Sequence, residues 1–159
     1  TFGKFTHQTP IIDGSTLYYG GPDFSTTALK VVKKDGAYDA EQLWTTTLRS
    51  RFSTPVLKDG KIYGFFGNGI ITCVNAADGK TLWADTTARG DYASVIDAGS
   101  VLFFLTVKGD LIAVKPGGEK YEELAKYKIT ENEAYAHPLF WRKNVLLRDK
   151  ENEVMLSLE

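Results

Sequence analysis

Residues 54–83 read TPVLKDGKIYGFFGNGIITCVNAADGKTLW, and this stretch decides the fold. Four short runs of β-branched, aromatic and aliphatic residues are separated by three turn dipeptides, Asp59-Gly60, Asn68-Gly69 and Asp78-Gly79. Such dipeptides accept positive φ angles and favour tight β-hairpins. The stretch therefore predicts four antiparallel strands joined by hairpin turns, and the fold class is all-β.

The same pattern occurs once before this stretch and twice after it, with a period of about 40 residues. A four-stranded antiparallel sheet repeated at this period is typical of the blades of a β-propeller. We therefore expect the whole chain, residues 1–159, to be a partial β-propeller with blades at approximately 9–46, 54–86, 93–128 and 136–159. The last copy ends after three strands. The first copy is longer than the second because of two expected loops, at 21–27 and 33–42.

Tryptophan closes the first two copies, at Trp44 and Trp83. A tryptophan side chain can bury roughly 200 Å² and anchor one sheet on the next. We interpret both residues as structural, docking neighbouring blades, rather than as ligand-stacking residues. The third copy has no tryptophan at this point, and we expect Leu124 to take its place.

Residues 74–83, Val-Asn-Ala-Ala-Asp-Gly-Lys-Thr-Leu-Trp, resemble the blade signature of the pyrroloquinoline-quinone-like, or quinoprotein-type, β-propeller repeat family. The resemblance covers nearly the whole chain and is strongest over residues 54–84. In that family the tryptophan docks its ring between blades, and the closed ring usually has seven or eight blades. The resemblance implies that this chain holds about four blades of an eight-bladed ring.

A partial ring leaves two blade faces open, which favours association with further sheets. The remaining blades of a longer chain, or self-association of two copies into a closed ring, would cover these faces. In the resembled family an N-terminal strand commonly completes the last blade. We therefore expect residues 1–6 to be such a strand or the tail of a preceding blade.

The resemblance allows two classes of function, because this fold serves enzymes and scaffolds alike. Quinone-dependent dehydrogenases of the fold hold pyrroloquinoline quinone and Ca²⁺ in the central channel, with a catalytic aspartate and often two adjacent cysteines. This chain has one cysteine, Cys73, in an apolar run that predicts burial. We assign no catalytic residue and no metal ligand. We expect a non-enzymatic scaffold or binding domain without a cofactor; the alternative is a fragment of a quinone-dependent dehydrogenase that uses pyrroloquinoline quinone with calcium.

The composition points away from nucleic acid and from a membrane span. The chain has 19 basic and 20 acidic residues, and its net charge of −1 leaves no basic footprint for nucleic acid. No apolar run reaches the roughly 18 residues of a membrane helix. One member of the resembled family is a bacterial lipoprotein scaffold for outer-membrane protein assembly, which implies a periplasmic or other extracytoplasmic location.

Three loops precede the first strands of successive blades, at 48–53, 88–93 and 133–137, and each combines a charged side chain with an aromatic one. In propellers such loops surround the mouth of the channel, and binding residues concentrate on loops held by a rigid scaffold. We predict a binding surface for a protein or a small ligand there, formed by Arg51, Phe52, Arg89, Tyr92, Tyr135 and His137. The alternative is that these aromatic rings pack between blades and the arginines are merely solvated.

Overall fold

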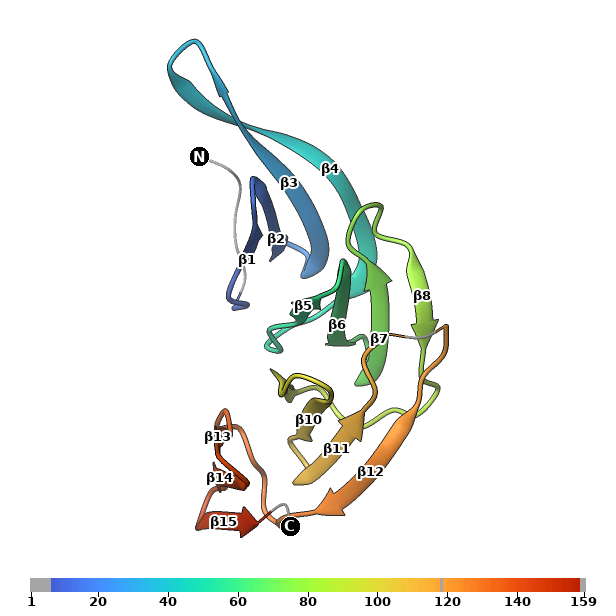
Figure 1. Cartoon of the computed structure of the whole chain (residues 1–159), viewed down its shortest axis with the longest axis vertical. Helices are drawn as coiled ribbons and strands as arrows, with labels where there is room; N and C mark the ends of the chain where they lie inside the picture. Colours follow the sequence, from blue (N-terminus) through green and yellow to red (C-terminus); the bar gives the residue numbers. More distant parts are fainter. Residues whose placement is uncertain (1–6, 118, 158–159) are drawn as a thin grey trace.

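The computed structural model describes residues 7–117 and 119–157, and within them it contains fifteen strands in four antiparallel sheets and no helix. The sheets follow one another along an arc, with the strands β4, β8 and β12 on its outer side (Figure 1). This arrangement confirms the predicted all-β fold with propeller blades. The prediction for residues 1–6 lies outside the described residues. No helix that could cross a membrane occurs in the described part of the chain.

The strands of each blade pair in the order in which they occur along the chain. The first blade contains β1 (Ile11–Asp13), β2 (Thr16–Gly20), β3 (Ser25–Lys34) and β4 (Ala37–Arg49). The second contains β5 (Val56–Lys58), β6 (Lys61–Phe66), β7 (Ile70–Asn75) and β8 (Thr81–Ala84). The third contains β9 (Ala93–Asp97), β10 (Leu102–Thr106), β11 (Asp110–Val114) and β12 (Glu123–Lys128). In the described residues the fourth has three strands, β13 (Leu139–Trp141), β14 (Asn144–Arg148) and β15 (Glu153–Ser157).

The loop expected at 33–42 is a β-hairpin, so that prediction was wrong. Strands β3 and β4 stay paired up to Lys34 and Ala37, and the turn between them has positive φ angles at Asp35 (50°) and Gly36 (82°). Positive φ at both central residues is the requirement of the hairpin turn that matches the twist of the flanking strands. Asp35-Gly36 is itself a turn dipeptide of the kind that the second blade contains. The flanking strands gave no signal, because the hairpin extends into solvent and its side chains show no apolar alternation.

An apolar cluster fills each of the three interfaces between neighbouring blades. In the first interface, Tyr18 and Trp44 of the first blade pack with Ile62 and Val74 of the second. In the second interface, Tyr63 and Trp83 pack with Leu102 and Val114. In the third interface, Phe103 and Leu111 pack with Leu147. The same face of each blade is therefore covered by the opposite face of the next, and this repeated packing holds the arc together.

Both tryptophan rings lie where the blades meet. The Trp44 ring is buried, and its Nε1 donates a hydrogen bond to the carbonyl oxygen of Ala76 at 3.0 Å. The Trp83 ring is also buried, but its Nε1 has no hydrogen-bond partner in the described structure. The contribution of these rings to stability remains a prediction.

Leu124 does not take the place of a docking tryptophan. Trp44 pairs with Ala28 and Trp83 with Cys73, and the corresponding pair in the third blade is Ala125 with Ala113. In each blade the register shifts just before this residue, so that one leucine bulges outward. Leu124 is this bulged residue, with 49% of its surface exposed, and Leu43 and Leu82 are its counterparts. The expectation was wrong by one residue, which in a strand means the opposite face.

Candidate functional site

Two hollows lie side by side where the connecting loops precede the second, third and fourth blades. Their volumes are about 550 Å³ and about 390 Å³, and both are bordered by Gly90, Asp91 and Lys108. They therefore form one depression, which we call the loop groove. Its borders are Arg49, Arg51, Phe52, Gly67, Asn68, Ala88, Gly90, Asp91, Tyr92, Val107, Lys108, Glu133 and Tyr135.

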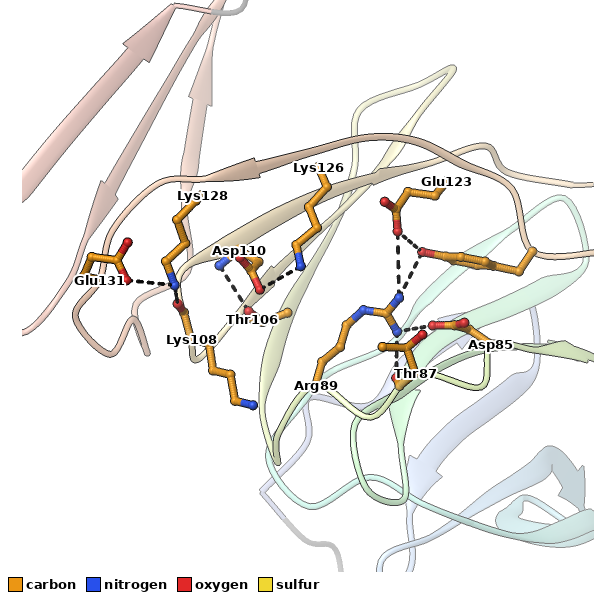
Figure 2. A network of polar contacts seen from close by, with 11 residues as sticks. Asp85, Thr87, Arg89, Thr106, Lys108, Asp110, Glu123, Lys126, Lys128 and Glu131 are labelled. Atoms are coloured by element: carbon orange, nitrogen blue, oxygen red, sulfur yellow. Dashed lines mark hydrogen bonds and ion pairs between the residues drawn. The ribbon is translucent and has the colours of Figure 1, made fainter.

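One end of the loop groove is basic. Arg49, Arg51 and Lys108 border it together with a single carboxylate, that of Asp91. In the described residues, neither the Arg51 nor the Lys108 side chain is in an ion pair with a carboxylate. Figure 2 shows the Lys108 side chain extending away from the polar network to which its own backbone oxygen belongs. Unpaired cations on a concave surface provide an attractive field for an anionic group.

The other end of the loop groove is aromatic. The rings of Tyr92 and Tyr135 lie 5.8 Å apart between centroids, and Phe52, which is half exposed, borders the same hollow. The Tyr92 hydroxyl donates to the carbonyl oxygen of Tyr135 at 2.9 Å and lies 2.9 Å from the Ser94 hydroxyl. Because these contacts occupy the hydroxyl, the Tyr92 side chain offers a partner its ring face more than its polar end.

Backbone hydrogen bonds hold the loops of the groove in place. The Val107 amide donates to the carbonyl oxygen of Tyr92 at 3.0 Å, and the Ala134 amide donates to the carbonyl oxygen of Val107 at 2.9 Å. The loops that precede the third and fourth blades are thereby attached to the turn between β10 and β11. A surface fixed in this way loses little conformational entropy when it binds a partner.

The structure brings four of the six predicted binding residues to the loop groove, namely Arg51, Phe52, Tyr92 and Tyr135. His137 is exposed and borders neither hollow; its Nδ1 lies 3.3 Å from the carbonyl oxygen of Pro138. The other histidine, His7, has its ring against Phe52, with 5.3 Å between the centroids.

Arg89 does not border the loop groove, so its inclusion in the predicted surface was wrong. Its guanidinium group is buried, forms an ion pair with Asp85 and donates to the Thr87 carbonyl oxygen at 2.8 Å (Figure 2). It also lies 3.3 Å from the Tyr121 hydroxyl and 3.8 Å from the Glu123 carboxylate. Arg89 therefore links the segment after β8 to the beginning of β12, on the outer side of the arc.

The surroundings of Arg89 also perturb a neighbouring side chain. Burial and the hydrogen bond to Glu123 raise the pKa of the Tyr121 hydroxyl above its usual range. Tyr121 in turn packs on the Trp83 ring, with 5.8 Å between the centroids. The polar network around Arg89 therefore supports the second interface between blades.

The predicted binding residues did not include Arg49, Asp91 and Glu133, although these lie in the three predicted loops, and Lys108 lies outside those loops. Lys108-Gly109 lies at the same place in the third blade as Asn68-Gly69 in the second, and both turns border the groove or adjoin it. The repeat alignment could have found Lys108, because in each blade this turn lies beside the loop that leads to the next blade.

The described residues contain no group of three or more histidine, cysteine or carboxylate side chains placed to hold a metal ion. Cys73 is buried in the second interface.

The blades, their order and their interfaces define the chain as part of a β-propeller. The sequence profile of the family described as outer membrane protein assembly factor BamB matches residues 3–158. The chain therefore belongs to the BamB-like family of pyrroloquinoline-quinone-like propeller repeats. No curated protein sequence matches the chain significantly.

Solved structures of similar fold include natural and designed propellers. BamB from Moraxella catarrhalis is 12% identical, with a TM-score of 0.68 over 94% of this chain and 43% of that one. The computationally designed Ika4 protein is 10% identical, with a TM-score of 0.73 over 99% of this chain and 92% of that one. The Cps50 (Swd1) propeller domain of Myceliophteria thermophila is 8% identical, with a TM-score of 0.68 over 91% of this chain and 52% of that one. The chain thus spans less than half the length of the Moraxella protein.

Proposed function

We propose that this chain is the binding segment of a β-propeller scaffold and holds an extended peptide segment of a partner protein in the loop groove. The observation that carries this proposal is the union of a basic end and an aromatic end in one depression. Aromatic and arginine side chains dominate the binding energy of protein interfaces. An acidic side chain of the partner would bind near Arg51 and Lys108, and an aromatic or aliphatic one would pack on Phe52 and Tyr135.

The family supports the scaffold part of the proposal. Its description names an assembly factor of the outer membrane, which is a task of protein binding outside the cytoplasm. By this likeness we propose that the present chain acts as a bacterial scaffold in the periplasm or another extracytoplasmic compartment.

A peptide library displayed on phage and selected on the purified chain tests the function. We expect the selected peptides to contain an acidic residue close to an aromatic one. Calorimetry should show that Arg51→Glu and Tyr135→Ala each weaken the binding of the selected peptide about tenfold or more. Tyr38→Ala is the matched control, because Tyr38 is an exposed aromatic residue of the hairpin formed by β3 and β4. If both groove variants bind the peptide as tightly as the control, the loop groove is not the binding surface.

We also infer that another blade covers the free face of the fourth blade. Leu139, Trp141, Leu146 and Met155 lie exposed on this face and come from all three strands of the sheet. By strand register, Leu146 corresponds to Tyr63, which is buried against the next blade. The remaining blades of a longer chain or a second copy of this chain would supply the cover.

A further inference from the structure

The third interface between blades lacks the ring that fills the first two. Three residues on neighbouring strands form one row on the same face of each of the first three blades. The rows are Tyr18, Ala28 and Trp44, then Tyr63, Cys73 and Trp83, then Phe103, Ala113 and Ala125. An alanine thus stands where the other two blades have an indole ring, and one face of the Phe103 ring stacks instead on Phe140 of the fourth blade, with 4.9 Å between the centroids.

A cavity lies beside this position. Its volume is about 390 Å³, and it is bordered by Ala113, the cross-strand partner of Ala125, and by Leu124 and Tyr127 on either side of Ala125. Phe103 and Leu156 also border it, so both the third and the fourth blade contribute to its walls. Most of its lining is apolar, and it shares no bordering residue with the loop groove.

The walls of the cavity correspond to the groups that contact tryptophan in the other interfaces. Phe103 is the counterpart of Tyr18 and Tyr63, whose rings lie 5.9 Å and 6.1 Å from the rings of Trp44 and Trp83. Leu156 pairs with Val145 as Val74 pairs with Ile62, and Val74 packs in the cluster around Trp44. The surroundings of an indole ring are therefore present in the third interface, and the ring itself is absent.

We propose that this cavity is a binding site for a small, uncharged, planar aromatic molecule of about the size of indole. Apolar cavities in protein interiors stay dry and take up aromatic molecules; a cavity of about 150 Å³ lined by leucine, isoleucine and phenylalanine binds benzene. The present cavity is larger and is open on one side, where Leu124 and Tyr127 are about half exposed. Its aromatic walls offer the offset and tilted ring contacts that stabilise aromatic pairs. A ligand here would join the third blade to the fourth in the way that Trp44 and Trp83 join the earlier blades.

Indole is the probe, and the experiment uses the whole chain. At a tenfold excess over its dissociation constant, indole should raise the melting temperature of the unsubstituted chain by at least about 2 °C. The variant Ala125→Trp supplies the ring covalently, so it should melt higher than the parent chain without indole and should lose the response to indole. Ala84→Trp is the matched control, because Ala84 is an exposed alanine at the end of the last strand of the second blade. It should keep the response.

Methyl NMR spectra of the unsubstituted chain locate the bound molecule without any variant. Indole should shift the methyl signals of Ile129 and Leu156, which border the cavity, and leave those of Leu139 and Leu146 on the free face of the fourth blade in place. The proposal is overturned if indole does not bind, if it shifts only the signals of the free face, or if Ala125→Trp responds as the parent chain does. Should Ala125→Trp fail to fold, the NMR result alone decides.

Discussion

At the residue scale, Trp44 and Trp83 occupy equivalent places in successive blades but differ in one hydrogen bond. Trp44 donates to Ala76, whereas the indole nitrogen of Trp83 is buried without a partner in the described structure. A buried polar group that loses its partner costs more than the bond itself contributes. The two residues therefore allow the packing of the ring to be separated from its hydrogen bond.

Truncating either ring to alanine should strongly lower the free energy of unfolding. Replacing the ring with phenylalanine should show a different cost at the two positions. Trp83→Ala should lower the free energy of unfolding by about 3–5 kcal/mol, because it removes a buried ring from the second interface. Trp44→Phe should cost about 1 kcal/mol more than Trp83→Phe, because only the former leaves a carbonyl oxygen unpaired. Urea denaturation of the variants measures these differences. Equal costs for the two phenylalanine variants would show that the hydrogen bond contributes nothing.

Two neighbouring residues of the same interface have perturbed ionisation. Burial raises the pKa of the Cys73 thiol from 9.0 to about 11. Burial also raises the pKa of the Tyr63 hydroxyl from 10.0 to about 12, even though the Gly117 amide donates to that hydroxyl at 2.6 Å. Both groups are neutral in the folded chain at pH values where the unfolded chain has begun to release their protons.

This difference predicts alkaline destabilisation. The stabilisation is complete below pH 9, where both groups are protonated in either state, and it decreases as the pH rises through the folded pKa values of about 11 and about 12. The urea midpoint should therefore be constant up to about pH 9 and fall above it. In Cys73→Ala the decrease should begin about one pH unit higher, near the ordinary pKa of tyrosine. A midpoint that stays constant to pH 11 in the parent chain would contradict the prediction.

At the element scale, the turn between β6 and β7 carries a contact between blades that the turn between β5 and β6 lacks. The Arg89 amide donates to the Gly69 carbonyl oxygen at 3.1 Å, so the segment leading to the third blade passes directly over this turn. A Cβ atom at Gly69 would lie 2.0 Å from the Gly90 carbonyl oxygen, whereas one at Gly60 would have nothing within 4 Å. Both glycines have similar positive φ angles, 81° and 69°.

The two turns should therefore respond differently to the same substitution. Gly60→Ala should cost about 1–2 kcal/mol, the cost of a side chain in the left-handed region. Gly69→Ala should cost at least twice as much, because the backbone at Gly90 has to move as well. It should also weaken peptide binding in the loop groove, which Gly90 borders. Denaturation and calorimetry on the pair of variants measure both effects, and equal stabilities would show that the approach of the two turns is not tight.

The elements also show how far sequence reasoning extends. The turn dipeptides of residues 54–83 correctly predicted the four strands of the second blade, because hairpin turns depend on local backbone preferences. The hairpin of β3 and β4 was missed although its turn is the dipeptide Asp35-Gly36, because its exposed strands have no apolar alternation. The docking position of the third blade was wrongly assigned to Leu124. A bulge that the sequence pattern does not predict moves the inward-facing position to Ala125.

At the scale of the whole molecule, the two ends of the arc present apolar side chains. The free face of the fourth blade carries Leu139, Trp141, Leu146 and Met155. On the first blade, Ile12 is 74% exposed and is the counterpart of Leu57, which packs in the first interface. Two copies related by a twofold axis would place each of these faces against the other, and this closed arrangement would leave neither uncovered.

We expect the isolated chain to self-associate through these faces. Light scattering should show a dimer at micromolar concentrations, and Trp141→Glu should shift the mass to that of a monomer, because it buries a charge in the contact. Tyr38→Glu, on the exposed hairpin, should leave the mass unchanged. A parent chain that remains monomeric at high micromolar concentration would mean that a second copy does not cover these faces, and further blades of a longer chain would be the remaining cover.

The sequence by itself determined the repeat, the antiparallel strands, the propeller class and the family, because these depend on turn chemistry and on a period that each copy shows by itself. Only the tertiary structure decided what each side chain faces. It placed Arg89 in a buried ion pair, gathered Lys108 and Asp91 into the loop groove, and opened a cavity beside Ala125. The physical reason is that these outcomes depend on the strand register, which a bulge shifts within a blade, and on the neighbouring blade, which the chain supplies about 40 residues further along.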